Sequence, residues 1–510
     1  MKRLLVIACI LASGVVASAS IPDPVQTDAG LISGTRGASP DVRVFKGIPF
    51  AAPPVGPLRW RAPQPVAHWD GVRKADQFGP RCMQGGPGGN RGGAAAPPAT
   101  SEDCLYVNVW TTAKTALDRM PVIVFSYGGG FTGGAGSEPR YDGEALAKKG
   151  VVFVTYNYRL GAFGFFAHPE LTKESDHHSS GNYAFMDFVA VLNWVQKNIG
   201  NFGGDPSRVT IMGESAGAML VSALVGSPAG KGLFHRAIAE SGAWMGLGIG
   251  KMTPLAQVEQ SGVQQAAAMG ASSIADLRAK SADEVQRGLR SAGMIVDGWI
   301  IPEDLSITFK GGRQNDVDVL VGSNQDEGTF FARGAAVAAQ TFTNQAKQRF
   351  GDRIDAYLKL YPAGSDSQAN DSSLRRSRDE LAWHMRTWAR LQSTGGKAKA
   401  YVFYFTKVQP GQEARGATHT AELAYAFGNL AEGQAWTDSD RRLADTMTSY
   451  WANFAAKGDP NGKGLPAWPA YKEKTSERMM ILGERVEAAP ELDAPRFAFF
   501  DAEYARQFPK

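Results

Sequence analysis

The sequence predicts an α/β fold in which a mostly parallel central sheet is flanked by helices. Short apolar runs rich in β-branched and aromatic residues, at 121–127 and 150–161, have the length and composition of strands buried on both faces. Segments with apolar residues at helical spacing lie between such runs, and strands that alternate with helices form parallel sheets. The chain has 510 residues, 43% of them hydrophobic, so it can bury a large core.

The first half of the chain begins with a strand pattern and ends with a helix pattern. Residues 41–51 show the alternation that is typical of a strand, and the two apolar runs follow. From Tyr183 onward, apolar residues recur every three or four positions, which predicts a helix. Glycines and Pro206 then bring that helix to an end.

A strand, a turn and a helix follow directly, at 209–212, 213–217 and 216–225, and residues 235–242 predict another strand. The later elements are helical segments at 255–290 and 330–395, a capping-box pattern at 281–284, and strands within 316–328 and 400–406.

The N-terminal segment predicts that the protein is exported. Residues 1–19 read as a signal peptide: Lys2 and Arg3 precede an apolar stretch too short to span a membrane, and cleavage is expected after Ala19. A buried N-terminal helix and a lipid anchor at Cys9 are the alternatives. We therefore expect a secreted or periplasmic protein without a membrane span.

Residues 20–510 contain no long linker and no internal repeat, which predicts a single domain. The net charge of +4 is spread along the chain without a basic block, so the sequence does not predict a nucleic-acid partner. No pattern predicts an oligomeric state.

Two cysteines, Cys82 and Cys104, remain after removal of the signal peptide. An even pair in an exported chain predicts a disulfide, and two free thiols are the alternative.

The turn GESAG places Ser215 between a predicted strand and a predicted helix. This context is that of a nucleophile elbow, a strained turn that exposes a serine hydroxyl, and an ordinary loop serine is the alternative. A serine hydroxyl needs a general base, and histidine is the usual one because its pKa lies near neutrality.

The order of groups in an elbow fold is serine, acid, histidine, which leaves three candidates for the base. His235 follows Ser215 too closely to leave room for an acid, and His384 lies in an amphipathic helix pattern where a packing or surface role is expected. His419 lies in a loop after the strand at 400–406 and is the predicted base. The acid can be Asp326 or Glu327, which both follow an apolar run.

Metal and cofactor signatures are not evident. The sequence has no CxxC or HExxH cluster and no convincing nucleotide-binding fingerprint, and Asp176, His177 and His178 are expected in a solvated loop. We therefore expect neither a cofactor nor a metal.

Eight motifs, in order between about residues 30 and 471, carry a resemblance to a known family. They are GIPFAAPPVGPLRWRAPQP, SEDCLYVNVW, YGGGFTGG, NYRLGAFGF, NFGGDPSRVTIMGESAGA, AIAESGA, GSNQDEGTFF and GDPNGKGLPAWPAY. The chain resembles the type B carboxylesterases, which include bacterial para-nitrobenzyl esterases, animal carboxylesterases and cholinesterases. The resemblance implies an α/β-hydrolase fold with helical insertions around an active-site gorge, and hydrolysis of a small-molecule carboxylic ester.

The resemblance also implies a role for each matching position. Its motif for the acid favours Glu327 over Asp326, which would complete a triad with Ser215 and His419. The remaining implied groups are the oxyanion donors Gly129, Gly130 and Ala216, the supporting residues Glu214 and Ser241, and the disulfide Cys82–Cys104.

Departures from the family pattern narrow the range of substrates that the resemblance implies. The segment between the cysteines has no tryptophan, so choline esters are not expected. A binding module on the same scaffold is the competing interpretation, but such relatives lose the serine. Related chemistry on lactones, thioesters, carbamates or amides would use the same groups. Trp244, Met245 and residues 294–299 can line an acyl pocket or simply pack in the core.

Overall fold

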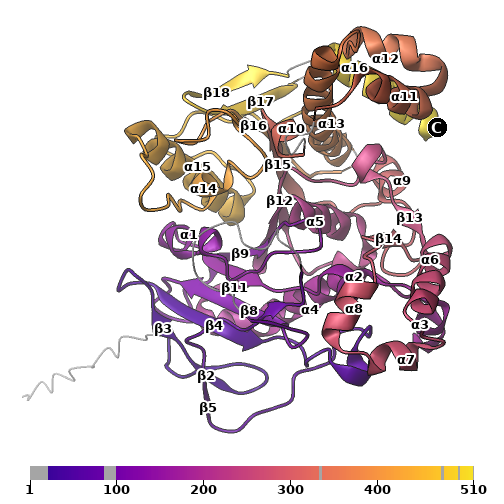
Figure 1. Cartoon of the computed structure of the whole chain (residues 1–510). Coiled ribbons are helices and arrows are strands. Elements are labelled where there is room, and N and C mark those ends of the chain that lie inside the picture. The colour runs from indigo at the N-terminus through magenta and orange to yellow at the C-terminus, as the bar shows by residue number, and fades with distance from the viewer. Residues whose placement is uncertain are drawn as a thin grey trace, which may run out of the picture.

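The structure is a computed structural model that describes residues 21–85, 99–331, 336–394, 396–472, 476–491 and 494–508 (Figure 1). The predicted signal peptide at residues 1–19 lies outside the described residues.

A large mixed sheet forms the centre of the molecule. Within the described residues, the strand order is β18-β17-β16-β15-β12-β11-β9-β10-β8-β4-β3. All pairs from β17 to β10 are parallel, and the outer pairs are antiparallel. The predicted mostly parallel sheet is therefore confirmed. The strands are β3 (Thr35–Arg36), β4 (Arg43–Pro49), β8 (Tyr106–Thr111), β9 (Met120–Ser126), β10 (Val152–Tyr156), β11 (Gly204–Glu214), β12 (Arg236–Glu240), β15 (Asp318–Asn324), β16 (Ala400–Phe405), β17 (Arg478–Leu482) and β18 (Val486–Pro490).

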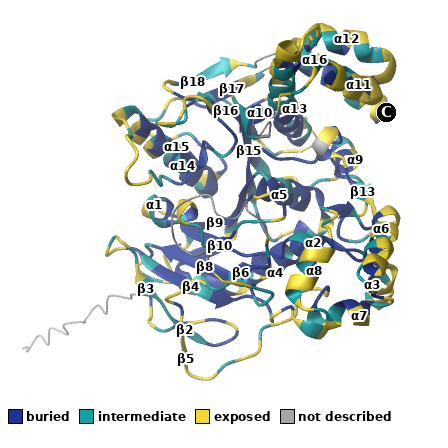
Figure 2. Ribbon diagram, in the orientation of Figure 1, coloured by how far each residue is buried: buried dark blue, intermediate teal, exposed yellow. Residues whose placement is uncertain are grey.

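Helices cover both faces of this sheet. On one face, α1 (Glu144–Lys148) packs on β8 and β10, and α15 (Asp438–Lys457) packs on β9 and β11. The other face is covered by α4 (Tyr183–Asn198), α5 (Ala216–Gly226) and α13 (Asp366–Thr394) (Figure 1). Because both faces are covered, every residue of β10 and β16 is buried, and the dark central strands of Figure 2 follow this pattern.

Two further groups of helices flank this core in Figure 1, and only part of each group falls in the segments predicted to be helical, 255–290 and 330–395. One group lies near α4 and the other near the C-terminus. The first contains α2 (Gly161–Phe165), α3 (Pro169–Glu174), α6 (Leu255–Ala268), α7 (Ile274–Ala279) and α8 (Ala282–Gly288), and the second contains α11 (Ala339–Phe350), α12 (Ile354–Leu360) and α16 (Ala494–Gln507).

Local signals in the sequence explain where several elements begin and end. Ser281 and Glu284 form the predicted capping box at the start of α8. Helix α4 is followed by a short 3₁₀ turn, and Gly203 then adopts a left-handed conformation. Strand β11 is longer than the predicted 209–212, because it begins at Gly204 and passes through an irregularity before Val209. Pro206 lies in this stretch and cannot donate a ladder hydrogen bond, which accounts for the irregularity.

Among the described residues, no helix is both long and apolar enough to cross a membrane. Cys82 and Cys104 form a disulfide, as predicted.

Candidate active site

Ser215 lies at the sharp turn between β11 and α5. Its φ of +55° is in a region that non-glycine residues rarely adopt, which marks a strained backbone. The flanking glycines allow this turn: a Cβ on Gly217 would lie 1.9 Å from the Ser126 carbonyl oxygen, and one on Gly213 would lie 2.4 Å from that of Gly217. The strand–turn–helix context predicted for Ser215 is therefore present.

His419 and Glu327 lie in line with Ser215. The His419 Nε2 atom is 2.8 Å from Ser215 Oγ, and its Nδ1 atom is 2.5 Å from Glu327 Oε2. His419 and Glu327 are buried, whereas Ser215 is partly exposed. A hydroxyl that opens to solvent, backed by a buried imidazole and a buried carboxylate, is the arrangement of a serine nucleophile with its base and orienting acid.

Two neighbours fix the Glu327 carboxylate from the side opposite His419. Ser241 Oγ donates to Glu327 Oε1 at 2.5 Å, and the backbone N–H of Asn324 donates to the same oxygen at 2.9 Å. The other acid candidate, Asp326, points elsewhere and accepts from the Ala417 N–H at 2.8 Å. The geometry therefore favours Glu327 as the partner of His419.

Glu214 brings a second carboxylate to His419. Its Oε1 atom is 3.2 Å from His419 Nε2, the nitrogen that faces Ser215. Burial alone would lower the pKa of His419, but the negative charges of Glu327 and Glu214 and the hydrogen bond to Glu327 raise it to about 9. Burial raises the pKa of Glu214 to about 6, although His419 and Arg140 pull it down.

The glycine loop after β9 begins beside Ser215 and carries backbone N–H groups without an acceptor. Gly129 and Gly130 have φ values of +111° and +61°, and among the described residues no group accepts a hydrogen bond from either N–H. The N–H of Ala216 has no intrahelical partner, because Ala216 is the first residue of α5. Gly128 has a different role: a Cβ there would lie 2.5 Å from Glu214 Oε2 and 2.9 Å from Ser215 Cβ, so the strand end can pass the elbow only as glycine.

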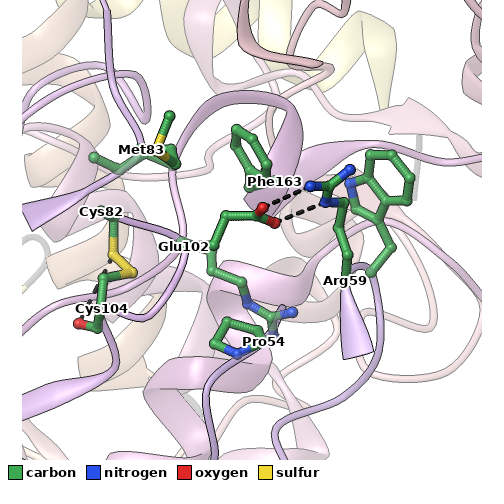
Figure 3. Close-up of a pocket in the computed structure, with 10 residues that line it drawn as sticks. Pro54, Arg59, Cys82, Met83, Glu102, Cys104 and Phe163 are labelled. Atoms are coloured by element: carbon green, nitrogen blue, oxygen red, sulfur yellow. Dashed lines mark hydrogen bonds and ion pairs between the residues drawn. A yellow bond between two sulfur atoms is a disulfide. The ribbon is translucent and has the colours of Figure 1, made fainter. Parts of the chain in front are cut away.

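A small cavity beside the disulfide contains none of the predicted catalytic groups. Figure 3 shows the Arg59 guanidinium facing the Glu102 carboxylate, to which it donates two hydrogen bonds. Arg59 also donates to the carbonyl oxygens of Leu277 and Lys280. Through these contacts Arg59 links the disulfide region to the end of α7, which indicates a structural role for the ion pair.

Two buried acids near the site were not predicted. Glu240 ends β12 and its carbonyl oxygen accepts the Ser215 N–H at 2.8 Å, while its side chain accepts from Trp451 Nε1 at 2.8 Å. Glu422 lies three residues after His419, and the Asn324 side-chain amide donates to it. Burial raises the pKa of Glu240 to about 8, and burial with repulsion from Glu240 holds the pKa of Glu422 well above its usual value. No feature of the sequence predicts that either glutamate is buried, although Glu240 lies within the motif AIAESGA.

The remaining candidates pack in the core or lie at the surface. His384 is fully buried within α13, so the packing alternative holds for it. Trp244 is buried and donates its indole N–H to the Met219 carbonyl oxygen at 3.0 Å. His177 stacks on Trp299 with ring centroids 3.7 Å apart, and the described residues contain no cluster of metal-ligating side chains.

Comparisons with known proteins point to one family. The model of the carboxylesterase family matches residues 22–500. The fumonisin B1 esterase of Sphingopyxis macrogoltabida is 37% identical, over 93% of this chain and 89% of that protein. The para-nitrobenzyl esterase of Bacillus subtilis (strain 168) is 35% identical, over 92% of this chain and 96% of that protein.

A solved structure of PNB esterase superposes with a TM-score of 0.81 at 32% identity and covers 95% of this chain and 99% of that chain. The chain therefore belongs to the carboxylesterase family, has the α/β-hydrolase fold and is a carboxylic ester hydrolase.

Proposed function

We propose that the protein hydrolyses small to medium carboxylic esters by a two-step mechanism in which Ser215, His419 and Glu327 form the catalytic triad. The observation that carries this proposal is the continuous hydrogen-bonded line from Ser215 Oγ through the imidazole to the Glu327 carboxylate. This line ends at a partly exposed hydroxyl next to backbone N–H groups that lack acceptors.

In the first step, neutral His419 takes the proton from Ser215 as the oxygen attacks the ester carbonyl carbon. Glu327 holds the imidazole in the tautomer that exposes Nε2 and stabilises its protonated form. The N–H groups of Gly129, Gly130 and Ala216 bind the oxyanion, and the loss of one side-chain donor from a hole of this kind costs about 3 kcal/mol of transition-state stabilisation. His419 then returns the proton to the leaving alcohol.

In the second step, a water molecule loses a proton to His419 and attacks the acyl-serine carbonyl. The tetrahedral intermediate uses the same three N–H groups, and its collapse releases the carboxylic acid and restores Ser215. Every step uses side chains and backbone of this chain.

The cellular setting is part of the proposal. A signal peptide at residues 1–19 would place one domain, residues 20–510, in the periplasm or outside the cell. The disulfide Cys82–Cys104 supports this setting, because disulfides persist mainly in oxidising compartments.

The test of the proposal is Ser215→Ala with a short para-nitrophenyl ester as substrate. We expect kcat to fall by at least about 10⁴-fold with an unchanged Tm, because the nucleophile is lost and the fold is not. Ser261→Ala, an exposed serine on α6, is the matched control and keeps full activity. A fluorophosphonate probe should label Ser215 in the wild type, and turnover retained by Ser215→Ala would exclude the proposed mechanism.

A further inference from the structure

The glycine loop, residues 128–134, is held at two points after the donor glycines. The first is a backbone contact, in which the Gly161 N–H donates to the Phe131 carbonyl oxygen at 2.7 Å. The second is made by one side chain: Gln84 Oε1 accepts the Gly134 N–H at 3.0 Å, and Gln84 Nε2 donates to the Gly134 carbonyl oxygen at 2.9 Å. The amide of Gln84 therefore pairs with Gly134 as a neighbouring strand would.

Gln84 is itself fixed by its neighbours. Its Nε2 atom also donates to the Cys82 carbonyl oxygen at 3.0 Å, and Arg81 Nη2 donates to its Oε1 atom at 3.0 Å. Cys82 is bonded to Cys104, which lies two residues before β8. A short covalent path thus runs from the central sheet through the disulfide to the side chain that holds Gly134.

The packing around Gly134 explains why its position matters for the donors. A Cβ on Gly134 would lie 2.6 Å from the Tyr127 ring and 2.8 Å from the Gly128 carbonyl oxygen, so Gly134 lies directly against the start of the glycine loop. The turn between them is closed by the N–H groups of Thr132 and Gly133, which both donate to the Gly129 carbonyl oxygen. A shift of Gly134 would therefore displace the peptide groups of Gly129 and Gly130, whose N–H groups have no acceptor among the described residues.

We propose that Gln84 is a positioning residue for the oxyanion donors, and that it couples the Cys82–Cys104 disulfide to the active site. The proposal rests on the assignment of Gly129 and Gly130 as donors in the proposed function. Oxyanion donors act through fixed geometry, and a misplacement of about 1 Å can reduce turnover about 100-fold. Loss of the Gln84 contacts leaves the donors present but less well placed.

The first experiment replaces the amide and keeps its shape. Gln84→Met fills nearly the same space without hydrogen bonds to Gly134, and Gln64→Met at an exposed position is the matched control. We expect kcat to fall between about 10- and 100-fold with KM within twofold. Binding of a trifluoromethyl ketone, which mimics the tetrahedral intermediate, should weaken in proportion to kcat/KM. A lower Tm with unchanged kcat would show a purely structural role and overturn the proposal.

The second experiment tests the coupling to the disulfide. Cys82→Ser/Cys104→Ser should lower kcat in the wild-type background, whereas in the Gln84→Met background it should lower Tm with little further loss of kcat. Independent, multiplicative losses of kcat would show that the disulfide does not act through Gln84. Ser215→Ala is measured in parallel. Turnover retained by this variant would exclude the proposed catalytic mechanism itself, whereas the Gln84 variants test only the positioning of the oxyanion donors.

Discussion

His419 Nε2 faces two oxygens, Ser215 Oγ at 2.8 Å and Glu214 Oε1 at 3.2 Å. The negative charge of Glu214 stabilises the protonated imidazole and contributes to the raised His419 pKa of about 9. Protonated His419 cannot act as a base, so kcat/KM of the free enzyme should still rise between pH 7 and pH 9.

Glu214→Gln should therefore move the acidic limb of the kcat/KM profile to lower pH. Removal of a negative charge disfavours the imidazolium and lowers the His419 pKa, and each pH unit of displacement raises kcat/KM at pH 7 about tenfold if the chemistry is otherwise intact. A profile measured from pH 5 to pH 10 with a neutral ester checks this. An acidic limb that stays at the same pH or moves to higher pH would contradict the role assigned to Glu214.

Gly130→Ala tests the donor assignment at a single residue. Its φ of +61° makes alanine strained by about 1–2 kcal/mol, and a Cβ there meets only Thr132 Oγ1, at 4.0 Å. Gly270→Ala is the matched control, since Gly270 has a φ of +69° and nothing within 4 Å of its Cβ position. Both variants should lose similar stability in urea unfolding. Only Gly130→Ala should lose kcat, by about 100-fold, because its β-carbon hinders the approach of the substrate carbonyl to the retained N–H groups. Equal kcat values would mean that these glycines serve folding alone.

At the scale of elements, the carboxyl ends of three neighbouring parallel strands assemble the site. Glu214 ends β11, Glu240 ends β12, and Asn324 ends β15 three residues before Glu327. The apolar runs and the elbow predict these strands because burial on both faces demands continuous hydrophobic sequence. They do not predict which polar side chains at the strand ends face inward. Glu240 and Glu422 could not be recognised from sequence, because their burial arises only when separate strands and loops meet.

Glu240→Gln should increase stability more at high pH than at low pH. The folded-state pKa of Glu240 is raised to about 8, so between its ordinary pKa and pH 8 the folded form keeps a proton that the unfolded chain releases. The stability of the wild type therefore falls as pH rises through this window, by on the order of 4 kcal/mol if the shift is fully expressed. The uncharged amide removes this dependence. Urea unfolding at pH 5 and pH 8 measures the free energy of unfolding of the variant and the wild type, with Glu432→Gln at an exposed position as control. A gain in stability that is the same at both pH values would contradict the raised pKa of Glu240.

At the scale of the whole molecule, the site draws on segments spread over most of the chain, from Gln84 to Glu422. The sequence motifs identify the proposed catalytic groups because the turns around them require particular residues: Gly213, Gly217 and Gly128 each occupy a place where a Cβ would collide. The contacts that orient those groups, such as the Gln84 amide on Gly134, use ordinary side chains at ordinary spacings. They become visible only when the fold brings residues 50 positions apart together.

The first residues that the structure describes offer a last prediction, because they bear on where the signal peptide should end. Ile21 is buried, its N–H donates to the Lys114 carbonyl oxygen at 2.6 Å, and Arg43 Nη1 donates to its carbonyl oxygen at 3.1 Å. Cleavage after Ala19 leaves Ser20 ahead of this docked residue, whereas cleavage beyond Ile21 would remove it. A chain that begins at Asp23 should be less stable than one that begins at Ser20 by about 2–3 kcal/mol, since it loses one buried isoleucine and its hydrogen bonds. Both chains should keep the same kcat, because Ile21 contacts none of the proposed catalytic groups. Urea unfolding of the two chains, together with N-terminal sequencing of the exported protein, checks this, and equal stability or a mature N-terminus beyond Ile21 would be inconsistent with it.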